Sequence, residues 1–198
     1  IRKLVVQVYD IEIFPNVFHC TCKNTETNEL KFFEISERKN QLTEMVSFFR
    51  LKEYIFCGYN NKHYDDVVIN YCIDLYNKLN VCNYLKICSS LFNLSKCIIE
   101  SEQGKTDKFK KWMYCNYFYS MDLLIMQFSS KLRVGLKEMQ VTMHYDNVQE
   151  YSGDFNNWLK ESDIDEMIAY NVNDVESTTS LLNRLKPDID LRLFIQEE

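Results

Sequence analysis

The stretch "VYDIEIFPN", residues 8–16, places Asp10 and Glu12 at the end of an apolar run that otherwise has the composition of a buried strand. Side chains two residues apart on a strand point to the same face, so these acids would lie side by side. Neighbouring carboxylates repel each other, and a core strand rarely keeps such a pair without a partner. A divalent cation is one such partner, and a solvated strand end is the alternative.

The composition indicates one globular domain over residues 1–198. No apolar stretch approaches the roughly 20 residues of a membrane span, and the first residues carry no signal-peptide pattern. We therefore expect a soluble, cytoplasmic protein with no membrane partner. The sequence lacks an initiator methionine, and its end has the pattern of a helix cut off while still apolar on one face. This indicates a domain excised from a longer chain.

Charge and cysteine usage narrow the class of protein. The net charge of −6 argues against a protein that coats nucleic acid through bulk electrostatics, but not against an enzyme that grips it locally. The eight cysteines form no C-x-x-C pair, so we expect reduced thiols. The cluster His19-Cys20-Thr21-Cys22 favours a core strand over a metal site, because Cys20 and Cys22 would share one buried face.

Strand and helix patterns follow one another in the order of an α/β protein. Short polar turns separate the first three strands, which is the spacing of an antiparallel meander, whereas later strands follow helices and suggest parallel additions. We expect strands at 3–9, 16–22, 30–35, 54–59 and 112–122, and helices at about 37–51, 65–79, 123–128, 136–143 and 164–185. More helix is expected to about residue 97, and a lysine-rich loop at 101–111.

Two further acidic sites follow in the sequence. Asp65 and Asp66 open a predicted helix, where acids also serve as ordinary partners of the helix dipole. Tyr170 and Asp174 lie one turn apart on one face of the last helix, which an amphipathic helix with a solvated acid would also explain. The joint occurrence of three acidic sites on a strand, a helix start and a late helix favours a common site.

These residues resemble the motifs of the DnaQ-like 3′-to-5′ exonucleases of the DEDD type, tyrosine subclass. Asp10-Ile11-Glu12 matches D-x-E, Asn60 with Tyr64-Asp65 matches N-x-x-x-F/Y-D, and Tyr170 with Asp174 matches Y-x-x-x-D. Asn61 offers an alternative start for the second motif. The segments "NVQEY", "NDVEST" and "DLRLFIQEE" look like the proofreading domain at the front of bacteriophage DNA polymerases.

The resemblance implies a ribonuclease H-like fold, with a mixed sheet of three antiparallel and two parallel strands flanked by helices. It implies hydrolysis of DNA from the 3′ end with two Mg²⁺ or Mn²⁺ ions, and Tyr170 orienting the attacking water. The implied partners are single-stranded DNA or frayed 3′ ends and a polymerase domain in the same chain, in a host cytoplasm if the protein is phage-encoded. The implied metal ligands are Asp10, Glu12, Asp65 and Asp174, and the candidates for holding the terminal nucleotide are Asn60, Tyr64 and Ile11.

Other residues near these motifs have structural interpretations beside the functional ones. We interpret His63 as a surface residue, Asp66 as a helix-start acid, and Asp122 as a buried or capping acid that would also suit the site. A basic-aromatic run either clamps single-stranded DNA or is a solvated loop. Its residues are Lys105, Lys108, Phe109, Lys110, Lys111 and Trp112, with Lys108, Lys110 and Lys111 as the DNA-binding candidates.

Three alternative functions stay open. A ribonuclease of the DEDD type would use the same acids, because nothing in the sequence reads the 2′-hydroxyl. A catalytically inactive nucleic-acid-binding domain would keep the fold, although such a domain would be expected to lose some of these acids. A protein-interaction domain would need no metal.

Overall fold

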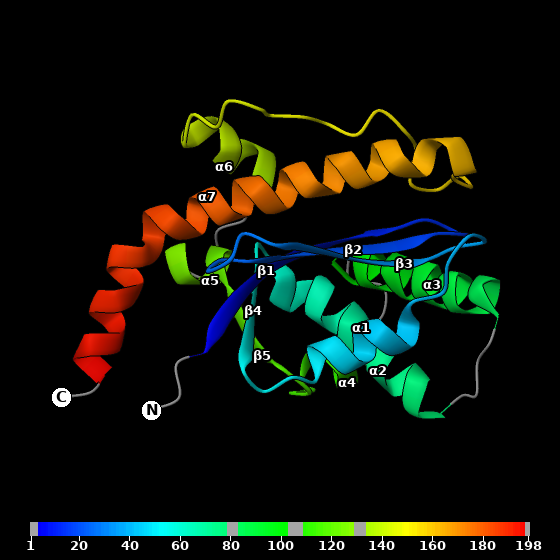
Figure 1. Ribbon diagram of the computed structural model, residues 1–198, viewed down its shortest axis with the longest axis horizontal. Helices are drawn as coiled ribbons and strands as arrows, with labels where there is room; N and C mark the ends of the chain where they lie inside the picture. The colour runs from blue at the N-terminus through cyan, green and yellow to red at the C-terminus, as the bar shows by residue number, and fades with distance from the viewer. Residues whose placement is uncertain (1–3, 79–82, 103–108, 129–133, 197–198) are drawn as a thin grey trace.

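The computed structural model describes residues 4–78, 83–102, 109–128 and 134–196. Within them, five strands form one mixed sheet of order β3-β2-β1-β4-β5 (Figure 1). The strands are β1 (Val5–Ile13), β2 (Phe18–Asn24), β3 (Leu30–Ile35), β4 (Tyr54–Gly58) and β5 (Tyr119–Asp122). The first three pair antiparallel, and β4 and β5 extend the sheet in parallel from β1. The expected α/β architecture, in which a mixed sheet of three antiparallel strands is extended by two parallel strands, is confirmed.

Helices cover both faces of this sheet (Figure 1). The long helix α7 crosses one face against β1 and β2, with α6 beside it, and the other face carries α1 to α4. The helices are α1 (Leu42–Phe49), α2 (Asp65–Lys78), α3 (Tyr84–Glu102), α4 (Lys110–Met113), α5 (Leu123–Gln127), α6 (Leu136–Thr142) and α7 (Ile164–Gln196). No described helix is long and apolar enough to cross a bilayer.

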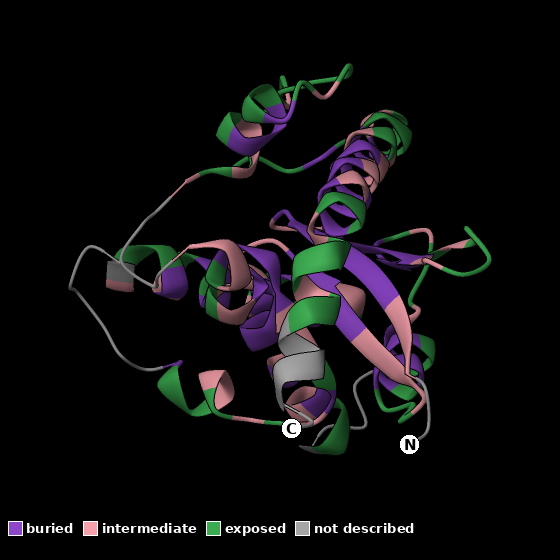
Figure 2. Cartoon of the chain, turned by 90° about the vertical axis from the view of Figure 1, so that its left-hand side faces the viewer, coloured by how far each residue is buried: buried purple, intermediate pink, exposed green. Residues whose placement is uncertain are grey.

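The alternation of side chains along β1 divides the interior into two layers, visible as buried ribbon on both sides of the sheet in Figure 2. Tyr9, Ile11 and Ile13 pack into the larger cluster under α1 to α3, where Phe49 and Phe56 stack at 4.2 Å. Val8 packs on the opposite side, in the cluster that α6 and α7 cover. Asp10 and Glu12 therefore belong to the face beneath α7.

The antiparallel strand β2 confirms the interpretation of its cysteines. Cys20 and Cys22 are both fully buried in the larger cluster. His19 is also buried, and burial lowers its pKa to about 4, so that its ring is neutral. Its Nε2 lies 2.9 Å from Thr21 Oγ1. This segment is a packed core strand.

The pairing between β1 and β4 ends before β1 itself ends. Their parallel pairing runs only from Val5 to Val8, and β4 ends at Gly58, after which the chain turns sharply. A Cβ at Gly58 would lie 2.8 Å from Cβ of Asn61, so this turn requires glycine. The second half of β1 therefore has no pairing with β4. The helix α2 begins at Asp65, a few residues after the end of β4.

Several expected elements have different bounds. The strands expected at 3–9 and 16–22 extend to Ile13 and Asn24, and helix occupies both ends of the loop expected at 101–111, because α3 continues to Glu102 and α4 begins at Lys110. Three further differences have a visible cause or a larger extent. The strand expected at 112–122 is wrong over its first part, where α4 and a loop precede the short β5. Asn70 Nδ2 on α2 donates to the carbonyls of Trp112 at 2.9 Å and Cys115 at 3.1 Å. In a strand these carbonyls would instead accept from the backbone of a neighbouring strand. The helix expected at 37–51 begins only at Leu42, because Ser36 N donates to Lys39 O at 2.7 Å in a turn. The last helix extends beyond 185, to Gln196.

Candidate metal centre

Three of the predicted ligands converge from two elements. Asp10 and Glu12 come from the part of β1 beyond its pairing with β4, and Asp174 comes from α7, which packs across β1. One carboxylate oxygen from each residue lies within 4.8 Å of the others. A set of carboxylate oxygens at this spacing fits a hard divalent cation such as Mg²⁺ or Mn²⁺ better than zinc.

Asp65, the fourth predicted ligand, lies at the first residue of α2 and is buried. It is not part of the close trio, but the charge of Asp10 acts on it. The helix α2 covers the other face of the sheet, and Asp65 lies near enough to Asp10 for the charge of Asp10 to raise the pKa of Asp65. The structure thus brings three predicted ligands together and places the fourth next to them.

Burial and repulsion from neighbouring charges favour the protonated forms of Asp10, Glu12 and Asp65. Burial, with repulsion from Asp174, raises the pKa of Asp10 to about 8. Burial and the charge of Asp10 also raise the pKa values of Glu12 and Asp65. Asp10 is therefore protonated near neutral pH, and a bound cation would displace this proton.

This proton linkage gives a prediction for metal binding. We expect Mn²⁺ affinity, measured by titration calorimetry, to rise from pH 6 to pH 8 by about tenfold per pH unit for each proton displaced, and to level off above the pKa of Asp10. Affinity should rise with pH because fewer protons then compete with the cation for the carboxylates. Without metal, the raised pKa of Asp10 stabilises the folded protein at low pH, and this stability is lost as pH rises through about 8. In EDTA the melting temperature should accordingly fall from pH 6 to pH 8. Affinity that is flat over this range would contradict the linkage.

Side chains from α6 and α7 fix the carboxylates. Asn171 Nδ2 donates to Asp10 Oδ2 at 2.6 Å and also hydrogen-bonds Glu12. Lys137 Nζ donates to Asp174 Oδ1 at 2.5 Å, and Gln140 Nε2 donates to the same oxygen at 3.1 Å. Sequence reasoning missed all three residues. The spacing of Lys137 and Gln140 on one helical face was a signal, but it did not indicate which acid they would meet.

Tyr170 lies one turn before Asp174 and borders the trio. Its hydroxyl hydrogen-bonds Asp174, and burial with repulsion from that acid raises the pKa of the phenol far above its ordinary value. Lys137 Nζ lies 4.6 Å from the centre of its ring. Tyr170 is therefore a neutral phenol near a carboxylate, suited to holding a water rather than to removing its proton.

The candidates for nucleotide contacts have mixed environments. Asn60 is half-buried with a left-handed backbone at φ 60°, and its N–H donates to Asp122 Oδ1 at 3.0 Å. The hydroxyl of Tyr64 lies 2.6 Å from Ser95 Oγ on α3. The side chain of Ile11 is buried in the larger cluster, so only its backbone is left to face a nucleotide. Asn61, the alternative motif residue, is fully buried.

The other acids near the motifs have internal partners. Asp66 accepts hydrogen bonds from Tyr9 Oη, from Asn61 Nδ2 at 2.9 Å and from Ser120 Oγ at 2.6 Å, and so ties β1, β5 and the turn after β4 together. Asp122 caps α5 through the N–H of Leu124 at 2.9 Å. His63 is exposed, as expected.

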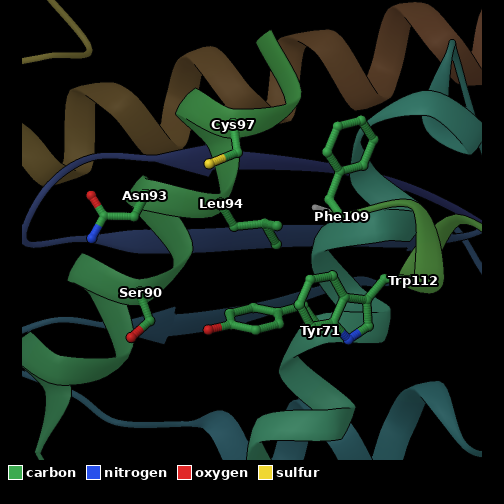
Figure 3. A pocket seen from close by; sticks show the side chains of 7 residues that line it. All are labelled: Tyr71, Ser90, Asn93, Leu94, Cys97, Phe109 and Trp112. Carbon is green, nitrogen blue, oxygen red and sulfur yellow. The ribbon is translucent and has the colours of Figure 1, made fainter. Parts of the chain in front are cut away.

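The described part of the basic-aromatic run lies on the α2 side of the fold. Lys105 and Lys108 lie outside the described residues, whereas Lys110 and Lys111 are exposed on α4. Beside them is a cavity of about 280 Å³ between α2, α3 and α4 (Figure 3). None of the acids described above lines this cavity, whose lining is Tyr71, Ser90, Asn93, Leu94, Cys97, Phe109 and Trp112.

The fold and the acidic trio define an α/β protein with a candidate site for divalent cations. No family model matches the chain, and no curated protein matches it. A solved structure titled "ExoI/SSB-Ct complex" is similar to it, with 14% identity and a TM-score of 0.40, over 98% of this chain. The chain spans 44% of the length of that structure's chain.

Proposed function

We propose that this chain is a metal-dependent nuclease that removes nucleotides from the 3′ end of DNA. The observation that carries the proposal is the convergence of Asp10, Glu12 and Asp174 within 4.8 Å beneath a neutral tyrosine. Such a site suits phosphodiester hydrolysis, which needs a positioned hydroxide and stabilisation of charge on the phosphate. The exonuclease-like order of the motifs supports the 3′-to-5′ direction.

The four acids have distinct positions and hence distinct proposed tasks. Asp10, Glu12 and Asp174 would hold one ion, and Asp10 with Asp65 would support a second. Two divalent ions about 4 Å apart supply the hydroxide and neutralise charge on the phosphate and leaving oxygen. The oxygen-only donor set favours Mg²⁺ or Mn²⁺.

The residues around the acids restrict their movement and hold the nucleophile. Asn171 orients Asp10 through its 2.6 Å hydrogen bond, and Gln140 orients Asp174. Lys137 offsets the charge of Asp174, which lowers the repulsion within the trio. The Tyr170 hydroxyl, next to Asp174, would direct a lone pair of water toward the phosphate.

We also propose a proofreading role beside a polymerase domain of the same longer chain, with single-stranded DNA or frayed 3′ ends as the substrate. The similarity of "NVQEY" and "NDVEST" to phage polymerase proofreading domains supports this role. Asn60, Tyr64 and the backbone of Ile11 are the proposed contacts of the terminal nucleotide, and Lys108, Lys110 and Lys111 those of the strand behind it.

The test compares matched single-stranded DNA and RNA oligonucleotides, labelled at the 5′ end, with Mg²⁺ or Mn²⁺. We expect a ladder that shortens from the 3′ end, released mononucleotides, and no cleavage in EDTA. A paired duplex should be degraded more slowly than the single strand. Faster loss of RNA would favour the ribonuclease. Cleavage of a circular single strand at a comparable rate would exclude the exonuclease, and DNA binding without cleavage would favour the inactive binding domain.

A further inference from the structure

The segment between α6 and α7 runs back along α7 as an extended chain (Figure 1). We call residues 145–159 the strap. At one end Asn147 Nδ2 donates to Asn173 Oδ1 at 2.9 Å, and Asn173 Nδ2 donates to Asn147 O at 3.0 Å. At the other end Asn16 Nδ2 donates to Leu159 O, and Leu159 N to Asn16 Oδ1, each at 2.9 Å. Paired amide hydrogen bonds thus fasten the strap to α7 and to the chain just after β1.

Between these two attachments, Tyr151 is turned toward the body of the protein, and Phe155 stacks on Phe14 beside it. Residues 148–150 and 152–158 are exposed, whereas Tyr151 is half-buried. Its ring lies 5.5 Å from the ring of Tyr170, 5.7 Å from Phe14 and 5.1 Å from Phe155, measured between centroids. Phe14 belongs to the buried cluster between the end of β1 and the start of α7, and Tyr151 packs against that cluster. The strap therefore presents a supported ring to the tyrosine of the candidate site.

The backbone of the strap is also adapted to this ring. A Cβ at Gly153 would lie 2.5 Å from Cε1 of Tyr151. The next residue, Asp154, fixes the turn by accepting a hydrogen bond from Asn156 N at 2.9 Å. The glycine therefore allows the Tyr151 ring to occupy its place against Tyr170, and any larger residue would push the ring away.

We propose that Tyr151 is a positioning residue, whose ring sets the orientation of the Tyr170 phenol and thereby the place of the water that the phenol holds. This inference rests on the proposed role of Tyr170. The ring of a tyrosine on a helix surface turns readily unless a neighbour restricts it, and an aromatic contact at this distance does so. Lys137 contacts the same ring, at 4.6 Å, but is also bound to Asp174. Among the hydrogen bonds and ion pairs of the described residues, none joins Tyr151 to the trio, and Glu12 acts on the Tyr151 phenol through its charge. Tyr151→Phe removes that phenol and keeps the ring, which lets the effect of the ring be measured separately.

The test uses three variants, each made with Tyr170 and in a Tyr170→Phe background. Tyr151→Leu removes the ring, Gly153→Ala displaces it without changing it, and Tyr151→Phe retains it. We expect Tyr151→Leu and Gly153→Ala to lower kcat by about tenfold, with KM for single-stranded DNA and Mn²⁺ affinity changed less than about twofold. Tyr151→Phe should restore kcat to within about twofold. In the Tyr170→Phe background, Tyr151→Leu should cost less than about twofold more.

Several outcomes would overturn the proposal. The full tenfold loss in the Tyr170→Phe background would show that Tyr151 acts independently of the phenol. A raised KM with unchanged kcat would show that Tyr151 contacts DNA instead.

A measurement without substrate separates this inference from the proposed function. In protein carrying ¹³C-labelled tyrosine, the Tyr170 ring signal is assigned from its loss in Tyr170→Phe. We expect that signal to shift in Tyr151→Leu and Gly153→Ala and to stay in place in Tyr151→Phe, even if the chain cleaves no DNA. An unmoved signal in folded Tyr151→Leu would disprove the positioning role, whereas a moved signal without any nuclease activity would leave only the proposed function refuted.

Discussion

Replacing Asp174 by asparagine should lower turnover on single-stranded DNA by at least about 1,000-fold, because a neutral amide holds a divalent cation far more weakly than a carboxylate. Asp174 is the residue of α7 whose oxygen joins those of Asp10 and Glu12 within 4.8 Å. Mn²⁺ affinity, measured by calorimetry, should fall in parallel. The fold should persist, since the relief of repulsion with Asp10 and Glu12 offsets the loss of the ion pair with Lys137.

The same helix offers a matched control. Glu176 lies two residues further along α7, and its carboxylate accepts from Lys23 Nζ at 2.6 Å, away from the trio. Glu176→Gln should keep turnover within about twofold of the unchanged protein, because Glu176 lies outside the trio and its amide oxygen can still accept from the buried ammonium of Lys23. Tyr170→Phe should keep Mn²⁺ affinity and lower the rate by roughly 10- to 1,000-fold. Normal turnover in Asp174→Asn would mean that the centre must be rebuilt around other acids.

Replacing Asp66 by alanine should lower the free energy of unfolding by roughly 3 to 4 kcal/mol, because several hydrogen-bond donors in the interior would lose their acceptor at once. The carboxylate accepts from Tyr9 Oη, Asn61 Nδ2 and Ser120 Oγ, which lie on different elements. Urea denaturation followed by circular dichroism would measure the loss.

Asp10→Asn is the contrasting variant in EDTA. Burial raises the pKa of Asp10 to about 8, so a neutral amide should leave stability unchanged or higher, and its oxygen can still accept from Asn171. The increase in melting temperature that Mn²⁺ produces should disappear. Equal loss of stability in both variants would contradict the separation of Asp66, as a structural acid, from Asp10, as a ligand.

The strands and the pair of Asp10 and Glu12 were predictable because their signals are local. The alternation along β1 and the spacing of Asp10 and Glu12 depend on neighbouring residues only. The family-like motif supplied Asp174, which lies far away in the sequence. Lys137, Gln140 and Asn171 were not predictable, because a polar residue on a helix has the same pattern whether it faces water or a carboxylate.

The failure at 112–118 has a tertiary cause. This segment has the aromatic content of a strand, but its side chains bind α2: Trp112 Nε1 donates to Asp74 at 3.2 Å, and Tyr117 Oη donates to the same carboxylate at 3.0 Å. Tyr71 also packs edge-on against Trp112, with centroids 4.6 Å apart. Contacts of this kind override strand propensity, which mostly reflects packing.

The early departure of β4 from β1 affects how this centre would respond to sequence change. Beyond Val8, the ladder between these strands has ended, so the peptide groups of β1 on that side are no longer paired with β4. Peptide dipoles are the same for every residue type, so their share of any binding energy survives the replacement of side chains. Alanine scanning would therefore underestimate the binding energy that this edge of β1 contributes. Homologues could retain that contribution after most of their sequence identity had been lost.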